Sequence, residues 1–255
     1  MPTIEAPITH LLGQLQSARA EGDRFFNIIK RNALYERPID ARHRIIFYIG
    51  HLDGFDSIQI CRERLGAQSA DPELDALFQA GIDPDSTHLP SDTPSDWPSL
   101  DQVFAYVNRC RRHVDAHLDN APEGVIHMAL EHRLMHLETL AYMFHNISYQ
   151  LKNAPVGRVL SAQTETADGN EWLVIPAGEA VLGKPNDETF GWDNEYEEVR
   201  RPVAEFRIQR FSVTNGDYLK FVDEGAPIPH FWVRRGDALY YRGMFAEFPL
   251  PLDWP

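Results

Sequence analysis

Two histidines, His132 and His136, lie four residues apart in the segment HMALEHRLMHLETLAYMFH (residues 127–145), which is otherwise rich in apolar side chains. Four residues advance an α-helix by about 400° and about 6 Å, so the two imidazoles would share one helix face. A buried imidazole needs a hydrogen-bond partner or a metal ion, because its polar nitrogens are costly to leave unpaired. The pair therefore predicts either a metal site or two core histidines bonded to neighbouring groups.

A second pair with the same spacing, His113 and His117, lies in the segment CRRHVDAHLDN. Arginines and aspartates surround this pair, and it lies beside the apolar stripe of its segment rather than within it. A solvated helix face accounts for it, so the spacing alone does not predict a metal site. The pair at 132 and 136 differs because its surroundings are apolar, where unsatisfied imidazoles are costly.

A metal ion held by His132 and His136 needs at least one more ligand. Glu131 is one residue from His132, and Glu138 is two residues from His136, which is about 200° around a helix. Both carboxylates should therefore point away from the face that the histidines share. For Glu138 we expect a salt bridge or a buried supporting role rather than direct ligation.

His51, in the segment FYIGHLDGFD, is the better candidate for a third ligand. It lies near the apolar stripe of an earlier helix, and Gly50 and Gly54 would let another element come close. Its alternative role is that of a core histidine bonded to a carbonyl group. His127 and His145 are weaker candidates, because each lies more than one turn along the helix from the central pair.

The elements that must position these residues are helices, because helical spacing of apolar residues runs through the first 150 residues. The expected helices cover residues 11–29, 40–58, 99–118 and 127–145. Pro38 and Asp40 are a plausible cap for the second helix, the third begins near Ser99, and the first has a possible bend at Gly22. Four amphipathic helices of this length are typical of a four-helix bundle.

A long proline-rich connection, GIDPDSTHLPSDTPSDWPSLD (residues 81–101), separates the second and third expected helices. It is either a plain connection or a lid, since long ordered loops are often functional. After about residue 152 the pattern changes, and EWLVIPAGEAVLG alternates about a Pro-Ala-Gly turn like two short strands. We expect a second domain with short strands from residue 171, which continues beyond Pro255 because so few strands can hardly cover a core.

The composition excludes several classes of partner. The 255 residues carry 24 basic and 38 acidic side chains, a net charge of −14, and such a surface repels nucleic acid. No apolar run approaches the roughly 20 residues of a membrane span, and the N-terminus lacks the layout of a signal peptide. We therefore expect a cytoplasmic protein without a membrane partner, in which Cys61 and Cys110 are reduced core residues.

His51 together with the pattern His132-x-x-x-His136-x-Glu138 resembles the three-histidine iron site of the nonheme-iron sulfoxide synthases of ergothioneine and ovothiol biosynthesis. Those enzymes join a DinB-like helical bundle to a domain like the formylglycine-generating enzyme, which has a C-type-lectin-like fold. VIPAGEAVLG, FGWDNEYE and FSVTNGDYLKFV are similar to the opening segments of that second domain, in the same order.

The resemblance implies an α plus α+β chain with three parts. These are a DinB-like four-helix bundle in residues 1–152, a linker in residues 153–170, and the first part of a formylglycine-generating-enzyme-like domain in residues 171–255. It also implies that His51, His132 and His136 bind Fe(II), that O₂ is a co-substrate, and that imidazole C2 of a histidine derivative becomes bonded to sulfur. Three neutral imidazoles leave about three positions open on iron, as in the facial triads of oxygen-activating iron enzymes.

Two features differ from the ergothioneine branch. Met135 stands where that branch has a glutamine able to hold the substrate imidazole, and Met135 cannot make such a bond. The segments EHRLMHLETLAYM and RHRIIFYIGHLDGFD resemble bacterial selenoneine synthases more closely, which form a carbon–selenium bond on hercynine from a selenosugar. We therefore expect hercynine with a selenium donor, and histidine or hercynine with a thiol donor is the nearest alternative.

No catalytic residue is singled out, because the family's active-site tyrosine belongs to the later part of the second domain. Tyrosines of the second half that nothing places at the metal are Tyr218, Tyr240 and Tyr241. Arginines that could meet a substrate carboxylate are Arg62, Arg64 and Arg158, and the acidic run DNEYEE (residues 193–198) is expected to be a solvated turn.

Two other functions remain open on the same bundle. One is a DinB-like zinc-dependent hydrolase or thiol transferase, in which the ion activates water or a thiol without redox chemistry. The other is a non-catalytic binding module whose ion is structural.

Overall fold

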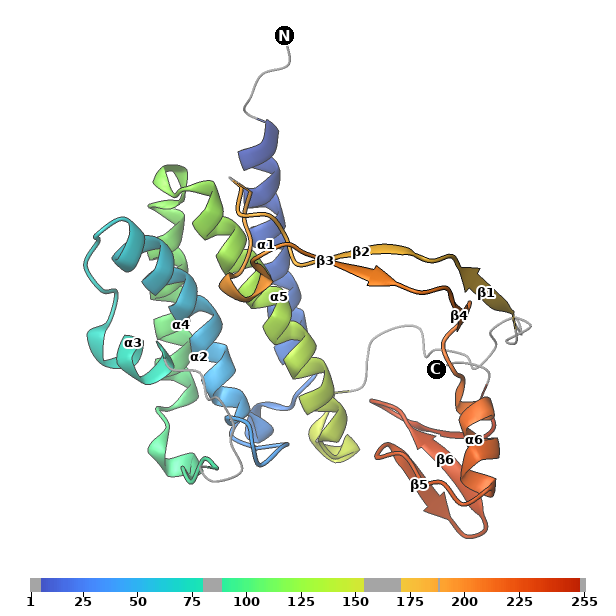
Figure 1. The fold of residues 1–255 in the computed structure, drawn as a ribbon. Coiled ribbons are helices and arrows are strands. Elements are labelled where there is room, and N and C mark those ends of the chain that lie inside the picture. Colours follow the sequence, from blue (N-terminus) through green and yellow to red (C-terminus); the bar gives the residue numbers. More distant parts are fainter. Residues whose placement is uncertain (1–5, 80–88, 154–170, 188, 253–255) are drawn as a thin grey trace. The chain divides into compact units, whose positions relative to one another are not determined.

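The computed structural model describes residues 6–79, 89–153, 171–187 and 189–252, and the chain divides into two compact units (Figure 1). The first unit spans residues 1–154 and the second spans residues 155–255. All but the first residue of the expected linker at 153–170 lies outside the described residues. No helix in the described part of the chain is both long and apolar enough to cross a lipid bilayer.

Four long helices make up most of the first unit: α1 (Ala6–Phe26), α2 (Ile45–Asp56), α4 (Leu100–Asp115) and α5 (Glu123–Asn146). α2 packs against α4 and α5, and α1 packs against α5 (Figure 1). The expected four long helices are confirmed, and so is a chain that mixes helices with small sheets. The likeness of each unit to a known domain remains a prediction.

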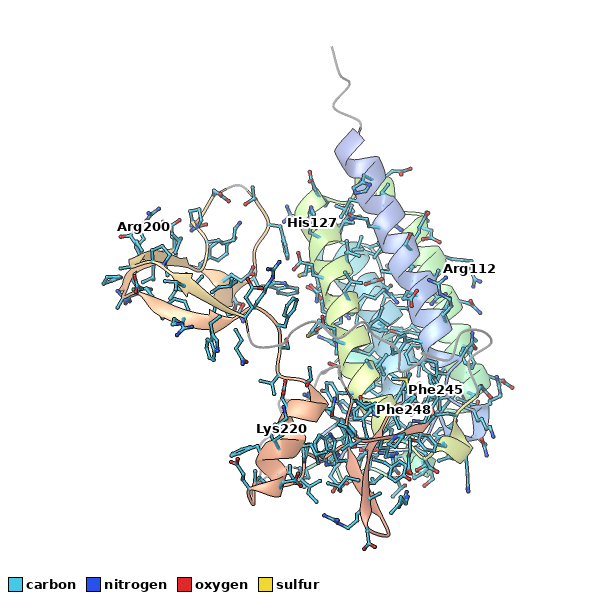
Figure 2. All side chains as sticks on the ribbon, turned by 90° about the vertical axis from the view of Figure 1, so that its right-hand side faces the viewer. Arg112, His127, Arg200, Lys220, Phe245 and Phe248 are labelled. Atoms are coloured by element: carbon cyan, nitrogen blue, oxygen red, sulfur yellow. The ribbon has the colours of Figure 1, made fainter. Side chains whose placement is uncertain are left out.

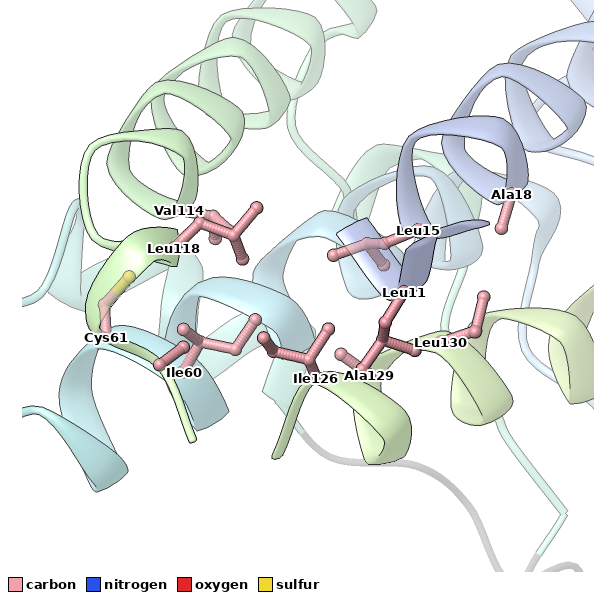
Figure 3. Close-up of a cluster of buried hydrophobic side chains, with 11 residues drawn as sticks. Leu11, Leu15, Ala18, Ile60, Cys61, Val114, Leu118, Ile126, Ala129 and Leu130 are labelled. Carbon is pink, nitrogen blue, oxygen red and sulfur yellow. The ribbon is translucent and has the colours of Figure 1, made fainter. Parts of the chain in front are cut away.

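A buried apolar cluster joins α1, α4, α5 and the segment that follows α2 (Figure 3). On α1, Leu11, Leu15 and Ala18 recur at the spacing of one helix face and are buried. They pack with buried residues of the other elements, namely Ile60, Cys61, Val114, Leu118, Ala121, Ile126, Ala129 and Leu130. Burial of each leucine or isoleucine side chain contributes about 1.5–3 kcal/mol, so this cluster accounts for the mutual packing of the helices.

The second expected helix differs from the prediction at both ends. α2 begins at Ile45 after an extended Arg44, so Pro38 and Asp40 are not its cap. Beyond α2 the chain continues as a π-helix, Ser57–Arg64, with both Ile60 and Cys61 buried. Apolar spacing cannot distinguish this continuation from an α-helix, because the stripe simply persists across the change of hydrogen bonding.

Other boundaries also differ. α1 ends at Phe26, and Ile29 instead forms an isolated antiparallel bridge with Lys152. An additional short helix, α3 (Pro72–Gln79), was not expected. The sequence signal for this helix is an aspartate followed by a proline, Asp71 and Pro72. Asp71 caps the helix, because its Oδ1 accepts a hydrogen bond from Leu74 N at 3.2 Å.

α4 begins where the sequence predicts. The Ser99 hydroxyl accepts a hydrogen bond from Gln102 N at 3.4 Å, and Gln102 Oε1 accepts one from Ser99 N at 2.9 Å. This reciprocal pair is a capping box, which satisfies two amide groups at the start of the helix.

The expected lid at residues 81–101 is described only from residue 89 onward. That part is tied to the chain before α2. The Asp92 carboxylate accepts hydrogen bonds from Arg37, from Arg44 Nε at 3.0 Å and from Trp97 Nε1 at 2.7 Å. The described part of this connection is therefore anchored by half-buried groups.

The second unit has three small antiparallel sheets and one helix among its described residues. The pairs are β1 (Trp172–Ile175) with β4 (Phe206–Gln209), and β2 (Gly178–Leu182) with β3 (Val199–Val203). The third sheet contains β5 (Trp232–Arg235), β6 (Ala238–Arg242) and β7 (Glu247–Pro249), and the helix is α6 (Asn215–Asp223). The two strands expected about the Pro-Ala-Gly turn are present, but each pairs with a later strand.

Few side chains of the second unit are buried within its described residues. Trp232 is buried and donates from Nε1 to Asn215 Oδ1 at 2.7 Å. Val174 and Ile208, by contrast, are exposed on their strands, and Arg200 projects from β3 (Figure 2). Among the described residues, the larger buried core is therefore in the first unit.

Candidate metal centre

Three histidines from two helices meet inside the first unit. His51 lies on α2, and His132 and His136 lie one turn apart on α5. The Nε2 atoms of His51 and His132 are 3.2 Å apart, those of His51 and His136 are 3.2 Å apart, and those of His132 and His136 are 3.1 Å apart. His51 is 3% and His132 is 8% exposed. The structure thus brings together the three residues that the sequence suggested as metal ligands.

The orientation of His51 is fixed by a backbone carbonyl. Its Nδ1 lies 2.6 Å from the carbonyl oxygen of Phe78, a residue near the C-terminal end of α3. A carbonyl oxygen only accepts, so Nδ1 donates and Nε2 keeps its lone pair. Histidines that bind metals are commonly held in this way. The two roles considered for His51, a carbonyl-bonded histidine and a metal ligand, are therefore compatible.

Phenylalanine rings stack on two of the imidazoles. Phe55 stacks on His132 with ring centroids 3.5 Å apart and an angle of 13°, and Phe47 stacks on His51 at 4.7 Å and 20°. These contacts restrict the rotation of the imidazoles and keep water from their faces.

The side of His136 is more polar. Tyr48 meets His136 edge to face with ring centroids 5.5 Å apart, and burial raises the pKa of Tyr48 to about 12. The Arg42 guanidinium lies over the ring of Tyr142 at 5.8 Å, and its charge helps to lower the pKa of His136. No carboxylate of the described residues pairs with Arg42. A neutral phenol and a positive charge thus border the histidines.

All three imidazoles are neutral near pH 7. Burial lowers the pKa of His132 to about 2 and that of His136 to about 3, and the neighbouring imidazoles act in the same direction. Burial also lowers the pKa of His51, against the effect of its bond to the Phe78 carbonyl. Neutral imidazole is the form that binds a metal ion, so no proton has to be displaced at these nitrogens.

The geometry fits a metal ion held by three nitrogens. Metal–nitrogen bonds of about 2.0–2.1 Å place ligand nitrogens about 2.9–3.4 Å apart in octahedral or tetrahedral coordination. The observed separations of 3.1–3.2 Å fall within this range. The Nδ1 atoms of His132 and His136 are buried and have no hydrogen-bond partner in the described part of the chain. The lone pair on His51 Nε2, the close approach of the other two Nε2 atoms and their unpaired Nδ1 atoms together favour a cation at the centre of the group.

The glutamates beside the histidines take no part in this geometry. Glu131 and Glu138 are both exposed on α5, as their angular positions predicted. The buried supporting role expected for Glu138 is wrong, and so is the salt bridge, because Glu138 forms no ion pair within the described residues. The three-histidine group therefore contains no carboxylate.

Buried charges lie directly beside the histidines, and the sequence reasoning missed them. Arg133, 1% exposed, donates from Nη2 to Asp53 Oδ1 at 2.9 Å, to Asp56 Oδ2 at 2.6 Å and to the Leu52 carbonyl at 3.1 Å. Burial acts to raise the pKa of Asp53, but Arg133 and Arg111 outweigh it and hold that pKa below its usual value. The available signal was an arginine within an apolar helical segment.

This network links the two helices that carry the histidines. Arg133 follows His132 on α5, and Asp53 lies two residues after His51 on α2. Because charged hydrogen bonds are directional, the network fixes how α2 lies against α5. The alignment of the three imidazoles therefore depends on a buried ion pair as well as on apolar packing.

The glycines beside His51 leave room for aromatic side chains of neighbouring helices. A Cβ at Gly50 would lie 2.6 Å from ring atoms of Phe78, and one at Gly54 would lie 2.6 Å from the Tyr106 hydroxyl. Gly50 thus allows α3 to approach until the Phe78 carbonyl reaches His51. The sequence had predicted a close approach here but not its partner.

The second histidine pair is less exposed than predicted. His113 and His117 are half-buried, and one ligand atom from each lies within 4.8 Å of the other and of Cys61. Cys61 and Cys110 are free and buried, as the sequence predicted.

The remaining candidates do not belong to the three-histidine group. His127, near the start of α5, lies 3.6 Å from Glu123, and His145 is in the last turn of that helix (Figure 2). Met135 is 48% exposed.

The structure describes two of the three arginines that could meet a substrate carboxylate, and all three of the tyrosines considered in the second half. Arg62 pairs with Glu63, Arg64 is exposed, and Arg158 lies outside the described residues. Tyrosines that are half-buried in the second unit are Tyr218, Tyr240 and Tyr241. The run at 193–198 is mostly exposed and includes the short helical turn Asp193–Glu195.

Known proteins provide independent information on this chain. No protein-family model matches it. Over 234 residues it is 32% identical to Ergothioneine biosynthesis protein 1 of Neurospora crassa, with 81% of this chain and 27% of that protein covered. The chain is similar to ergothioneine biosynthesis proteins. The protein of the same name from Schizosaccharomyces pombe is 27% identical over 276 residues, with 89% of this chain and 35% of that protein covered. The chain thus spans roughly a quarter to a third of the length of these relatives.

Proposed function

We propose that the first unit is the metal-binding part of a nonheme iron enzyme of ergothioneine-type biosynthesis. In this proposal Fe(II) and O₂ are used to join imidazole C2 of hercynine or histidine to sulfur or selenium. The observation that carries it is the triangle of three neutral imidazoles, whose Nε2 atoms are 3.1–3.2 Å apart with no carboxylate among them. The similarity to two ergothioneine biosynthesis proteins supports the pathway.

The proposed reaction is a four-electron oxidation. The C2–H bond and the S–H or Se–H bond break, and a C–S or C–Se bond and one S–O or Se–O bond form. O₂ provides the oxide oxygen and yields one water. Bound Fe(II) would supply the transfer of these electrons to O₂ at the positions that the histidines leave open.

The residues of this chain would contribute ligation, orientation and exclusion of water. His51 is held by the Phe78 carbonyl, and the rings of Phe47 and Phe55 cover two imidazole faces. Rigid ligands keep a reactive centre in one geometry, and apolar walls limit side reactions with water.

Tyr48 and Arg42 would act toward the substrate. With a pKa of about 12, the Tyr48 phenol stays protonated and can donate a hydrogen bond. The Arg42 guanidinium has no carboxylate partner in the described part of the chain, so it is available to a substrate carboxylate. Both residues contact or influence His136, which places them beside the proposed centre.

The choice between sulfur and selenium is the finer part of the proposal. We favour hercynine with a selenium donor, because Met135 offers no amide to an imidazole and lies exposed one residue before His136. The names of the two relatives favour sulfur. A thiol donor is therefore the direct competitor in any assay.

A zinc-dependent hydrolase or thiol transferase is the second candidate. Its supporting observation is that separations of 3.1–3.2 Å fit tetrahedral Zn²⁺ as well as six-coordinate Fe(II). In that case the ion would activate water or a thiol, and O₂ would not be consumed.

The test is an assay of metal-free protein loaded without oxygen with either Fe(II) or Zn²⁺. Hercynine is then offered with equal amounts of a thiol donor and a selenol donor, and O₂ is admitted. We expect Fe(II)-dependent O₂ uptake and a C2-substituted product, whose isotope pattern in mass spectrometry identifies selenium or sulfur. His132→Ala should abolish both signals, and His127→Ala, on the same helix, should retain them.

Other outcomes have definite meanings. Turnover with Zn²⁺ in the absence of O₂ would favour the zinc enzyme. Stoichiometric iron with neither O₂ uptake nor product, in a chain that also carries the part of the second domain expected beyond Pro255, would contradict the proposed oxidation and favour a binding module. A sulfur product alone, from the mixed donors, would overturn the preference for selenium.

A further inference from the structure

A second group of potential ligands lies where the π-helix meets α4. Donor atoms of Cys61, His113 and His117 lie within 4.8 Å of one another. Cys61 belongs to the π-helix Ser57–Arg64, and His113 belongs to α4. His117 lies just beyond Asp115, the last residue of α4. The group contains sulfur and two imidazoles, so it differs chemically from the three-histidine centre.

Hydrogen bonds at Nδ1 orient both imidazoles, and the bond of His117 fixes which of its nitrogens keeps a lone pair. His117 Nδ1 lies 2.8 Å from the His113 carbonyl oxygen, which can only accept, so Nδ1 donates and Nε2 keeps its lone pair. His113 Nδ1 lies 3.0 Å from the Ser57 hydroxyl. Neither Nε2 atom forms a hydrogen bond with another described residue. This is the arrangement in which metal-binding histidines are usually held.

Two residues of the π-helix take part in this group. Ser57 bonds to His113, and Cys61, four residues later, provides the sulfur. Figure 3 shows Cys61 directed toward Val114 and Leu118, which flank the two histidines in sequence. π-helical segments are rare and are often found at functional sites. The unusual helix and the ligand group are thus two observations at one place.

We propose that Cys61, His113 and His117 form a second metal site, which takes a soft divalent cation of the zinc class. A thiolate with two imidazoles suits Zn²⁺ and is a poor site for Mg²⁺ or Ca²⁺. Three protein ligands leave the fourth tetrahedral position to water or a small ligand. Zinc coordination requires donor separations of about 3.3–3.8 Å, so any pair of donor atoms near the 4.8 Å limit would close by about 1 Å on binding.

Two simpler roles of Cys61 make different predictions. As a reactive thiol it would need a lowered pKa, whereas burial and the charge of Asp56 raise the pKa of Cys61 to about 11. As a plain core residue it would only pack with Ile60 and Leu118, and the two histidines would bind no metal. A soft cation that displaces the thiol proton is the outcome that separates the proposal from both.

Co²⁺ is the probe, because thiolate ligation produces a charge-transfer band in the near ultraviolet that three imidazoles do not. We expect wild-type protein to bind two Co²⁺ per chain and to show the band, which Zn²⁺ should then abolish by displacement. Cys61→Ser should lose the band and one equivalent of Co²⁺. Cys110→Ser, the matched control at the other buried cysteine, should keep both.

His117→Ala guards against misfolding of the cysteine variant, because this half-buried side chain lies beyond the end of α4. It should also lose the band and one equivalent. His132→Ala should keep the band while it loses the other equivalent, so failure of this proposal is distinguishable from failure of the proposed iron site. One equivalent and no band in the wild type would overturn the second site, as would a band that persists in Cys61→Ser.

Discussion

The two histidine pairs of the bundle share a spacing and differ in what meets them. His132 and His136 lie on the continuous helix α5, and a third imidazole from α2 lies 3.2 Å from each. His113 and His117 straddle the end of α4 and meet a buried cysteine within 4.8 Å. The spacing places two imidazoles on one side, and the element that crosses that side decides which metal they suit.

The two groups also differ in how fully they are formed. In the first, stacked phenylalanines and a backbone carbonyl hold imidazoles whose separations already match metal coordination. In the second, the donor atoms lie within 4.8 Å of one another, and no aromatic ring of another element is stacked on either imidazole among the described residues. A preformed group binds with less loss of conformational freedom, so we expect the three-histidine centre to have the higher affinity for a metal that suits both.

The largest expected effect comes from removing one ligand of each pair. His132→Ala should abolish stoichiometric iron, because only His51 and His136 would remain, and two imidazoles cannot hold Fe(II) with comparable affinity. His113→Ala should leave iron bound, since it lies outside the three-histidine group. Metal analysis after anaerobic loading measures both, and equal iron content in the two variants would refute the assignment.

The next effect concerns the buried ion pairs, which only the first group has beside it. Arg133→Met should lower the free energy of unfolding by about 3–5 kcal/mol, because it leaves Asp53 and Asp56 buried without their main partner. Arg31→Met, which breaks an exposed pair with Asp101, should cost no more than about 1 kcal/mol. Urea unfolding of the two variants measures the difference, and similar midpoints would show that the network is not needed.

Acid should destabilise the metal-free protein through the first group. The folded-state pKa values of His132 and His136 are about 2 and about 3, far below the ordinary value of 6.5. Between about pH 3 and 6.5 the unfolded chain therefore binds more protons than the folded chain, so stability falls as the pH falls. Each imidazole should contribute about 1.4 kcal/mol per pH unit inside this window.

Urea midpoints of metal-free protein between pH 7 and pH 5 would measure this slope. His136→Gln should reduce the slope by the contribution of one imidazole. An unchanged slope would mean that His136 is not desolvated as its surroundings indicate.

The smallest effect tests the approach of α3. Gly50→Ala places a methyl group 2.6 Å from the Phe78 ring and should cost about 1–3 kcal/mol, with weaker metal binding as the Phe78 carbonyl moves from His51. Gly124→Ala, on α5 with nothing within 4 Å, should be neutral or stabilising by up to about 1 kcal/mol. Thermal unfolding of both variants measures the difference in stability. Equal stability would show that the Phe78 ring can move aside to admit the methyl group.

The sequence predicted those features that depend on local periodicity. The apolar stripes of α1, α4 and α5 are regular, and the capping box at Ser99 marks the start of α4. The π-helix was not predictable, because an apolar stripe does not reveal a change from i→i+4 to i→i+5 bonding. α3 was missed because eight residues give too little periodicity.

Within the site, residue types and a family resemblance were enough to select the three histidines. Their supports were not predictable, because the Phe78 carbonyl and the Phe55 ring offer no chemical signature in a sequence. Arg133 was overlooked because its partners lie about 80 residues away along the chain. Long-range polar pairing is decided by packing, which local patterns do not encode.

A centre made only of neutral imidazoles has a consequence for charge balance. The carboxylates of Asp53 and Asp56 are already paired with Arg133, with Arg111 and with Arg19, so neither carboxylate offsets a divalent cation at the histidines. Such a cation would keep its double positive charge in a poorly solvated interior, with Arg42 adding to it. Under the proposed function, electroneutrality would come from outside the protein, from the thiolate or selenolate and the carboxylate of the proposed substrates. Because the coupling of two binding free energies is reciprocal, an anionic substrate and the cation would each bind more tightly in the presence of the other. We therefore expect the affinity for the metal to be highest when substrate is bound.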